Sequence, residues 1–327
     1  MKVCIVGAGA IGGFIGARLA AAGQAELSAF ARGATLSALR RQGWRLQQGG
    51  ALIQAPALAS DQAVELGVQD LVIIAVKGPA LSAVAQQITP LIGPRTLLLP
   101  AMNGVPWWFC QNVAAVGPGP LQSVDPGGVL AEALPLAQVI GCVVHAATFV
   151  SEPGLVQHKV GQGLIIGEPA GGQTGRVQRI ADLLGQAGFE VTHSADVRRD
   201  IWYKLWGNMT MNPVSAITGA TADRVLADPL VREFCTRAML EASAIGALIG
   251  CPIEQTPADR HKITATLGAF KTSMLQDVEA KRPFELDAII GVVHEIGRRL
   301  GQATPNVDAL FGLARLFGRV HDLYPSV

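Results

Sequence analysis

The chain of 327 residues is long enough to bury more than one core, and half of its residues are hydrophobic. Its net charge of +1 excludes the strongly basic surface that nucleic acids or anionic membranes select, and no apolar run reaches the ~18 residues of a membrane span. The five cysteines are scattered and form no CxxC pair, which favours reduced thiols in a cytoplasmic protein and no metal site.

The N-terminus carries a glycine motif between a predicted strand and a predicted helix. Residues 3–6 form an apolar run typical of a buried parallel strand, and residues 10–22 read as a helix ended by Gly23. The first glycine of the motif permits a tight turn, the second lets the backbone approach a pyrophosphate, and the third lets helix and strand pack closely. The pyrophosphate would lie on the free N–H groups at the start of the helix. The expected cofactor contacts are Gly7, Gly9, Ala10, Ile11 and Gly12.

A secretory signal peptide is the alternative for this stretch, because one lysine precedes an apolar core and a run of alanines. Arg18 inside that core and the glycine spacing argue against it.

The second predicted strand, residues 26–31, indicates which dinucleotide binds. NAD-binding domains carry an acidic residue near the end of this strand, where it holds the ribose 2′-hydroxyl. Here that end carries Ala31 and Arg32, and Glu26 lies at the opposite end. A guanidinium suits the extra 2′-phosphate of NADP, so the sequence predicts NADP(H). The alternative is that Arg32 is a solvated surface residue.

Two further predicted strands deliver polar residues to the same edge of the sheet. Residues 70–76 lead to Lys77, and residues 96–100 lead to Asn103. Ligands of open α/β sheets bind beyond the carboxyl ends of the strands, so both residues are candidates for the site. For Asn103 and the glycine after it, an ordinary turn is the alternative.

The character of the chain changes near Asp196. Strand-like runs, mixed or antiparallel, continue to about residue 192, and helical periodicity dominates afterwards. We therefore predict an α/β Rossmann-type dinucleotide-binding domain over residues 1–195, followed by an all-α substrate and catalytic domain over residues 196–327.

The predicted helix at residues 201–213 holds the main catalytic candidate. Lys204, Asn208 and Asn212 lie four residues apart and share one helix face, while tryptophans and other large apolar residues occupy the other side. Buried polar groups need partners, and an anionic or carbonyl substrate would supply them. The alternative is a lysine extending from a core helix to solvent, beside structural asparagines.

Residues 271–277 and 282–287 hold a second group of candidate site residues. Pro283 separates two predicted helices and places Glu285 in the first turn of the second, a position where carboxylates are common for dipole reasons alone.

Together these motifs resemble the ketopantoate reductase (2-dehydropantoate 2-reductase) family along nearly the whole chain. The matching landmarks are the glycine motif at 7–12, Val76-Lys77, Asn103-Gly104, Lys204 with Asn208 and Asn212-Pro213, and residues 273–277 followed by Glu285-Leu286-Asp287.

The resemblance implies an NADPH-dependent reduction of a 2-oxo acid to a 2-hydroxy acid, with ketopantoate in pantothenate and coenzyme A biosynthesis as the substrate. Lys204 would then protonate the substrate oxygen, and Glu285 would accept a hydrogen bond from the distal hydroxyl of the substrate. Asn103, Asn208, Asn212 and Ser273 would bind substrate, with Ser273 at its carboxylate and Asn103 also at the nicotinamide. Arg32 and Lys77 would flank the adenosine phosphate.

The sequence departs from the family pattern at residues 106–128, which are rich in tryptophan, glycine and proline. This run could form part of the substrate wall, a surface excursion or a dimer contact. A paralogue that reduces another 2-oxo acid therefore stays open, as does a non-catalytic NADP-sensing module. The expected assembly is a monomer or a homodimer.

Overall fold

The apolar run at the N-terminus becomes the middle strand of a five-stranded parallel sheet in the computed structural model, which describes residues 1–325. The strands of this sheet are β1 (Lys2–Val6), β2 (Glu26–Phe30), β5 (Leu58–Ser60), β6 (Leu71–Ile74) and β7 (Leu97–Pro100). Their order is β5-β2-β1-β6-β7, and every neighbouring pair is parallel. The winding reverses beside β1, between β2 and β6, where open α/β sheets bind their ligands.

A second five-stranded sheet is built from a hairpin and three later strands. It contains β3 (Trp44–Gln48), β4 (Ala51–Ala55), β8 (Gly141–Glu152), β9 (Leu155–Gly167) and β10 (Glu190–His193). The hairpin of β3 and β4 is antiparallel, β9 is parallel to β3 and β10, and β8 pairs antiparallel with β9. Pairing with β8 runs along the length of β9.

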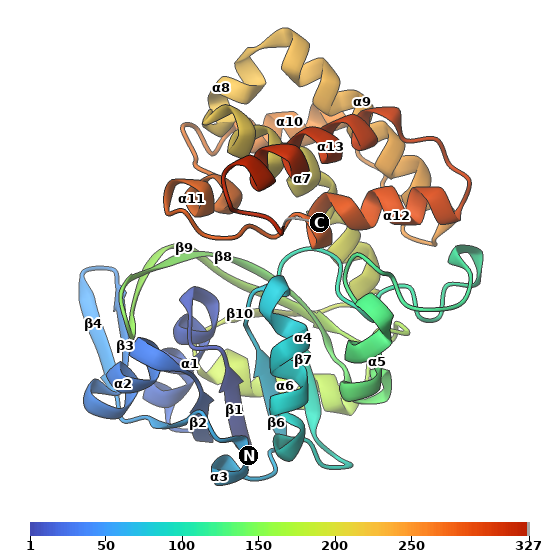
Figure 1. Cartoon of the computed structure of the whole chain (residues 1–327). Helices are drawn as coiled ribbons and strands as arrows, with labels where there is room; N and C mark the ends of the chain where they lie inside the picture. Colours follow the sequence, from blue (N-terminus) through green and yellow to red (C-terminus); the bar gives the residue numbers. More distant parts are fainter. Residues whose placement is uncertain (326–327) are drawn as a thin grey trace. The chain divides into compact units, whose positions relative to one another are not determined.

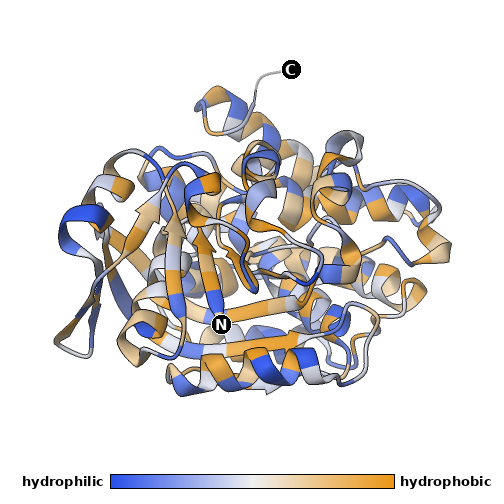
Figure 2. Ribbon diagram, turned by 90° about the horizontal axis from the view of Figure 1, so that it is seen from below, coloured by the Kyte–Doolittle hydropathy of each residue, from blue (hydrophilic) through white to orange (hydrophobic). Residues whose placement is uncertain are grey.

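The helix α1 (Ala10–Ala22) has the predicted bounds and contacts strands of both sheets (Figure 1). Gly23 ends it in the left-handed conformation, with φ of 66°. Phe14, Ile15 and Leu19 are buried, so α1 supplies much of the core of this part of the chain. Figure 2 shows how apolar residues concentrate on strands near the N-terminus. The other helices here are α2 (Gly33–Gln42), α3 (Ala63–Leu66), α4 (Gly78–Gln87), η1 (Thr89–Leu91), α5 (Val129–Ala133), η4 (Leu136–Gln138) and α6 (Gly175–Gln186).

After β10 the part of the chain that the structure describes forms helices and no strand. These are α7 (Val197–Thr218), α8 (Ala222–Ala227), α9 (Pro229–Leu248), α10 (Pro257–Ala265), α11 (Ser273–Glu279), the π-helix η5 (Asp287–Gly291), α12 (Val292–Arg299) and α13 (Pro305–Val320). The predicted change of character near Asp196 and the predicted fold class are confirmed. None of the helices within residues 1–325 has the length and apolar composition needed to cross a bilayer.

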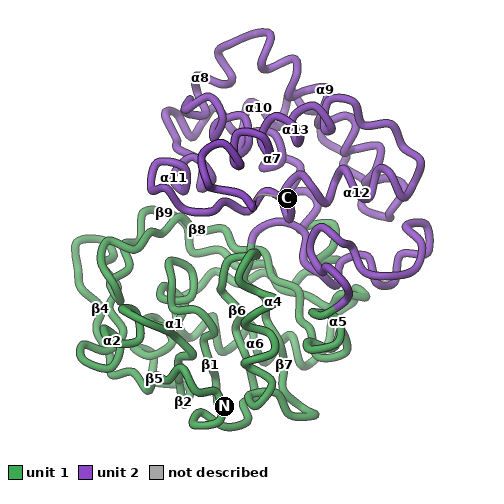
Figure 3. Tube along the Cα trace, in the orientation of Figure 1, with its two compact units in different colours: residues 1–102, 129–200 green, residues 103–128, 201–327 purple. Residues whose placement is uncertain are grey.

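The chain packs into two compact units (Figure 3). The sheet unit contains residues 1–102 and 129–200, and the helical unit contains residues 103–128 and the chain from residue 201 onward. The domain division at 195/196 stays a prediction. The packing units differ from it mainly at residues 103–128, which also contain η2 (Ala114–Val116) and η3 (Pro126–Gly128).

Aromatic side chains explain why residues 103–128 pack with the helices. Trp107, Trp108 and Phe109 are each 2% exposed or less. Phe109 stacks on Trp202 of α7, with ring centroids 6.0 Å apart. These rings belong to the core of the helical unit, so this segment is not a surface excursion at its aromatic end.

Candidate functional site

The glycine motif shapes the end of β1 as the sequence predicts. Gly7 has φ of 89°, and a Cβ there would lie 2.6 Å from the side chain of Val76. A Cβ on Gly12 would lie 2.0 Å from the carbonyl oxygen of Gly7. A Cβ on Gly9 would meet nothing within 4 Å, so the approach to the start of α1 is clear at this glycine. Close packing accounts for the first and third glycines, and the second leaves room for a ligand beside the helix N-terminus.

A cavity of about 270 Å³ lies at this end of the sheet unit. Its lining includes residues 7–9 of the glycine motif, the end of β2 and Arg32, which is exposed and directly precedes α2. None of its lining residues is acidic, and Glu26 lies at the opposite end of β2, as expected. The full lining is Gly7, Ala8, Gly9, Phe30, Ala31, Arg32, Thr35, Val76 and Val84. Arg32 in the lining, with no carboxylate beside it, favours a ribose that carries a phosphate over one that does not.

Three other predicted cofactor residues lie beside this cavity along the chain. Lys77 is exposed and lies between the lining residue Val76 and the first residue of α4. Ala10 and Ile11 are the first two residues of α1, so their N–H groups are among the four that a helix start leaves without intrahelical partners.

The main catalytic candidate has a defined partner within the helical unit. The ammonium group of Lys204 donates a hydrogen bond of 2.8 Å to Oδ1 of Asn103. The two residues lie 101 positions apart in sequence, and both are half-buried. The structure therefore brings together two residues that the sequence proposed on separate grounds.

The turn that carries Asn103 is fixed against η5. Gly104 has φ of 83°, and a Cβ there would lie 2.4 Å from the carbonyl oxygen of Ala288. The N–H of Val105 donates to the same oxygen at 2.8 Å. Only glycine meets both the positive φ and this close approach, so the Asn-Gly pair is more than an ordinary turn.

The accessible stripe of α7 is narrow. Among residues 201–216 of this helix, only Tyr203, Lys204 and Asn208 are not buried. Asn212, one turn after Asn208, is 5% exposed. Lys204, Asn208 and Asn212 thus share one helix face as predicted, but their side chains become less exposed toward Asn212.

Ser273 and Glu285 lie on other segments of the helical unit. Ser273 is exposed and is the first residue of α11, whose N-cap Thr272 accepts a hydrogen bond from the N–H of Leu275 at 3.2 Å. Glu285 is half-buried and precedes η5 by two residues, so the prediction that it lies in the first turn of a helix is wrong. The N–H of Phe284 donates to the carbonyl oxygen of Leu323 at 3.3 Å, and this contact holds the chain outside the helix.

The first residue of η5 takes part in a separate buried pair. Tyr324 donates a hydrogen bond of 2.6 Å to the carboxylate of Asp287. Burial raises the pKa of Asp287, against the opposing effects of this hydrogen bond and of Arg315. Burial and the bond to Asp287 also raise the pKa of Tyr324. The pair ties η5 to the end of the chain that follows α13.

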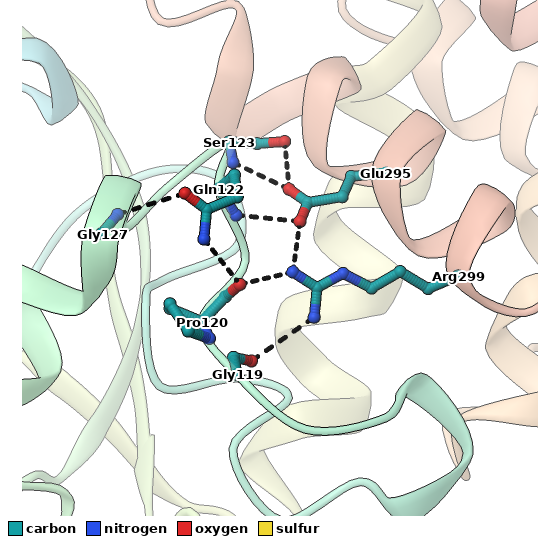
Figure 4. Close-up of polar contacts among 7 residues, drawn as sticks. All are labelled: Gly119, Pro120, Gln122, Ser123, Gly127, Glu295 and Arg299. Atoms are coloured by element: carbon teal, nitrogen blue, oxygen red, sulfur yellow. Dashed lines mark hydrogen bonds and ion pairs between the residues drawn. The ribbon is translucent and has the colours of Figure 1, made fainter.

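Residues 119–123 are held to α12 by a group that the sequence analysis missed (Figure 4). The carboxylate of Glu295 accepts hydrogen bonds from the N–H of Gln122 at 2.8 Å, and from the N–H and hydroxyl of Ser123 at 2.7 and 2.6 Å. Burial raises the pKa of Glu295, but these bonds and the one from Arg299 outweigh it and hold the pKa below the usual value.

Arg299 completes this group, which we call the α12 clamp (Glu295 and Arg299 with residues 119–123). Its guanidinium donates to Glu295 at 2.6 Å and to the carbonyl oxygens of Gly119 and Pro120. A Glu-x-x-x-Arg spacing is visible in the sequence, but it is common on helix surfaces and does not indicate a distant loop as partner.

The sequence analysis also missed a guanidinium beside the face of α7 that carries Lys204 and Asn208. Arg260 of α10 lies against Gly207 of α7, where a Cβ would come within 2.6 Å of its Nε and Nη2 atoms. A glycine inside a helix, next to the Lys204 and Asn208 positions, is the signal that could have indicated such a close approach.

Known proteins resemble this chain over almost its full length. A family model described as ketopantoate reductase PanE/ApbA matches residues 3–171, and its C-terminal counterpart matches residues 196–317. The 2-dehydropantoate 2-reductase of Mesorhizobium japonicum is 42% identical over 316 residues, which make up 96% of this chain and 97% of the relative.

Two solved structures also resemble this chain over almost its full length. One is the crystal structure of a protein from Ralstonia solanacearum MolK2 that is described as a ketopantoate reductase. Its sequence is 53% identical to this chain, with a TM-score of 0.95 and 99% of both chains covered. A D-mandelate dehydrogenase solved with NADH and anilino(oxo)acetate has a TM-score of 0.83 at 20% identity, over 99% of this chain and 100% of its own. The similarity to D-mandelate dehydrogenase shows a shared fold.

Proposed function

The chain belongs to the ketopantoate reductase family, whose members use NADPH, and it is an oxidoreductase that reduces a 2-oxo acid; we propose that its substrate is 2-dehydropantoate (ketopantoate) and its product pantoate. This places the enzyme in pantothenate and coenzyme A biosynthesis. The observation that carries the proposal is the 2.8 Å hydrogen bond between Lys204 and Asn103 on the accessible stripe of α7.

Lys204 acts as the general acid. NADPH, when bound, supplies the hydride that adds to C2 of the 2-oxo acid. The C2–O double bond becomes a single bond, and its oxygen takes a proton from the ammonium group of Lys204. The products are the 2-hydroxy acid, NADP⁺ and a neutral amine that is reprotonated from solvent. Asn103 holds the ammonium group in place, which restricts the direction in which the proton is presented.

Four other polar residues of the helical unit are assigned to the substrate site. Asn208 lies one turn after Lys204 on the same face, and its amide suits the oxygens of the acid. Ser273 offers a hydroxyl at the start of α11, and Asn212 supports Asn208 from the next turn. Glu285 accepts a hydrogen bond from the hydroxyl that ketopantoate carries away from the reacting carbon.

The cofactor residues follow from the cavity of the sheet unit. Gly7, Gly9 and Gly12 with the first turn of α1 hold the pyrophosphate. Arg32 and Lys77, which directly precede α2 and α4, bind the phosphate on the adenosine ribose. Asn103 has a second role at the nicotinamide end.

A paralogue acting on a bulkier, more apolar 2-oxo acid is the competing proposal. This alternative depends on the aromatic residues 107–109 forming a wall of the substrate site. All three are 2% exposed or less and take part in the core of the helical unit, which weighs against that role. The D-mandelate dehydrogenase likeness rests on the fold and does not favour a bulky substrate here.

The test is NADPH consumption by the purified protein with a panel of 2-oxo acids that includes ketopantoate, its analogue lacking the hydroxyl, and an aryl 2-oxo acid. We expect the highest kcat/KM with ketopantoate. Glu285→Ala should lower kcat/KM about 10- to 1000-fold with ketopantoate and little with the analogue, because only the former leaves a hydroxyl unpaired.

Glu279→Ala is the matched control, since Glu279 is an exposed carboxylate of α11 paired with Lys271. Equal losses with both substrates in Glu285→Ala, or a preference of the wild type for the aryl acid, would argue for the paralogue. Light scattering decides between a monomer and a homodimer. We propose a cytoplasmic location, because all five cysteines are buried free thiols.

A further inference from the structure

The accessible stripe of α7 is bordered by a cation that the proposed mechanism does not use. Arg260 of α10 lies across Gly207, which is three residues after Lys204. Resting on the proposed reduction of a 2-oxo acid, we infer that Arg260 binds the substrate carboxylate and that Gly207 is the feature of the sequence that lets it do so.

Gly207 admits the guanidinium to the helix surface. A Cβ on Gly207 would lie 2.6 Å from both Nε and Nη2 of Arg260, and 3.0 Å from its Cζ. A side chain at position 207 would have to displace the guanidinium, which in this structure lies against the backbone of α7. A glycine inside a helix is unfavourable relative to alanine, and close approach by another group is a common reason for it.

Tyr203 fixes the orientation of the guanidinium. Nη1 of Arg260 donates to the hydroxyl oxygen of Tyr203 at 3.2 Å, and Cζ lies 4.8 Å from the centre of the tyrosine ring. The tyrosine hydroxyl in turn donates to Oε1 of Gln255 at 2.7 Å. Hydrogen bonding and ring contact together hold Arg260 in one place on the helix.

The charge of Arg260 is not balanced by the residues around it. Within residues 1–325, no carboxylate forms an ion pair with Arg260, and its Nε is buried and donates to no residue. A half-buried guanidinium beside an aromatic ring and a helix normally has an acidic partner, because removing charge from water is costly. An anionic ligand would supply that partner.

The spacing along α7 matches a 2-oxo acid. Residues three apart on a helix lie about 5–6 Å from each other on neighbouring parts of one face. Lys204 lies at one end of this interval and Gly207, covered by Arg260, at the other. The keto oxygen and the carboxylate of a 2-oxo acid are on adjacent carbons. One molecule can therefore present its keto oxygen to Lys204 and its carboxylate to Arg260, while Ser273 contributes an uncharged hydroxyl.

The test compares a 2-oxo acid with its methyl ester, which keeps the keto group and lacks the charge. Arg260→Ala should raise KM for the acid about ten- to a hundredfold and leave the ester nearly unchanged, because one charge-assisted contact is lost. Arg260→Lys should recover part of the preference for the acid. Added guanidinium ion should partly restore turnover of the acid by Arg260→Ala.

Gly207→Ala tests the same contact without removing any charge. Its methyl group displaces the guanidinium, whereas alanine favours the helix, so the variant should unfold at or above the wild-type temperature. We expect it to lose preference for the acid over the ester, as Arg260→Ala does. Arg237→Ala is the control, because Arg237 is an exposed arginine of α9 in the same unit.

The outcomes separate this inference from the proposed function. If the wild type turns over no 2-oxo acid, the proposed function fails. If the wild type reduces the acid, but Arg260→Ala and Gly207→Ala lose equal activity with acid and ester or retain the wild-type preference, the role of Arg260 is overturned. If Arg260→Ala does not fold, Arg260→Lys and Gly207→Ala still decide the question.

Discussion

Replacing Glu295 by glutamine should destabilise the helical unit in a pH-dependent way. Each carboxylate oxygen accepts two hydrogen bonds, one from Gln122 and one from Arg299 at Oε1, and two from Ser123 at Oε2. An amide in either orientation turns its NH₂ group toward two of these donors. Charge-assisted hydrogen bonds contribute ~1.5–3 kcal/mol each and do not add fully.

The expected loss is about 3 kcal/mol at pH 7, because two such bonds disappear and the side chain is only 15% exposed. For a unit of this size that loss corresponds to a decrease of about 6–12 °C in Tm. The pKa of Glu295 is lowered in the folded protein, so its contribution is fully present above the unfolded value of about 4.3 and decreases as pH falls through the folded value.

Thermal and urea unfolding followed by circular dichroism at pH 7 and near pH 3 test this prediction. The difference between wild type and Glu295→Gln should be large at pH 7 and small at the acidic pH. Glu233→Gln is the control, because Glu233 is 57% exposed in an i,i+4 pair with Arg237 and should change stability by less than ~1 kcal/mol. A difference that is absent at pH 7, or unchanged at low pH, would refute the role given to the α12 clamp.

Three further predictions concern the reaction and its cofactor. Lys204→Ala should lower kcat by ~10²–10⁴, the usual contribution of a positioned general acid, in steady-state assays; a change confined to KM would contradict that role. Arg32→Ala should weaken NADPH binding about ten- to a hundredfold and leave NADH binding nearly unchanged, as measured by fluorescence titration; equal losses for both would show that Arg32 does not bind the phosphate. Gly104→Ala should lower kcat by about tenfold or more, since its methyl group would meet the carbonyl oxygen of Ala288 at 2.4 Å and move Asn103 away from Lys204. Rates equal to the wild type, with the variant folded, would show that this turn does not position the pair.

The sequence by itself determined the features that depend on neighbouring residues. The bounds of α1 were predicted to the residue, because glycine at position 23 and the motif before Ala10 act locally on the backbone. The central parallel strands follow in the same way from short apolar runs. The family and its cofactor were also predicted and are confirmed, since the landmarks occur in order along the chain.

Only the tertiary structure decided the features that join distant residues. The segment at residues 103–128 packs with the helices, where Phe109 stacks on Trp202. Glu285 lies outside the helix, next to Phe284, whose N–H donates to the carbonyl oxygen of Leu323. Glu295 and Ser123 are 172 residues apart, and no local pattern encodes which loop a helix carboxylate will bind. Periodicity and capping constrain a residue through its near neighbours, whereas these contacts depend on which surfaces meet when the whole chain packs.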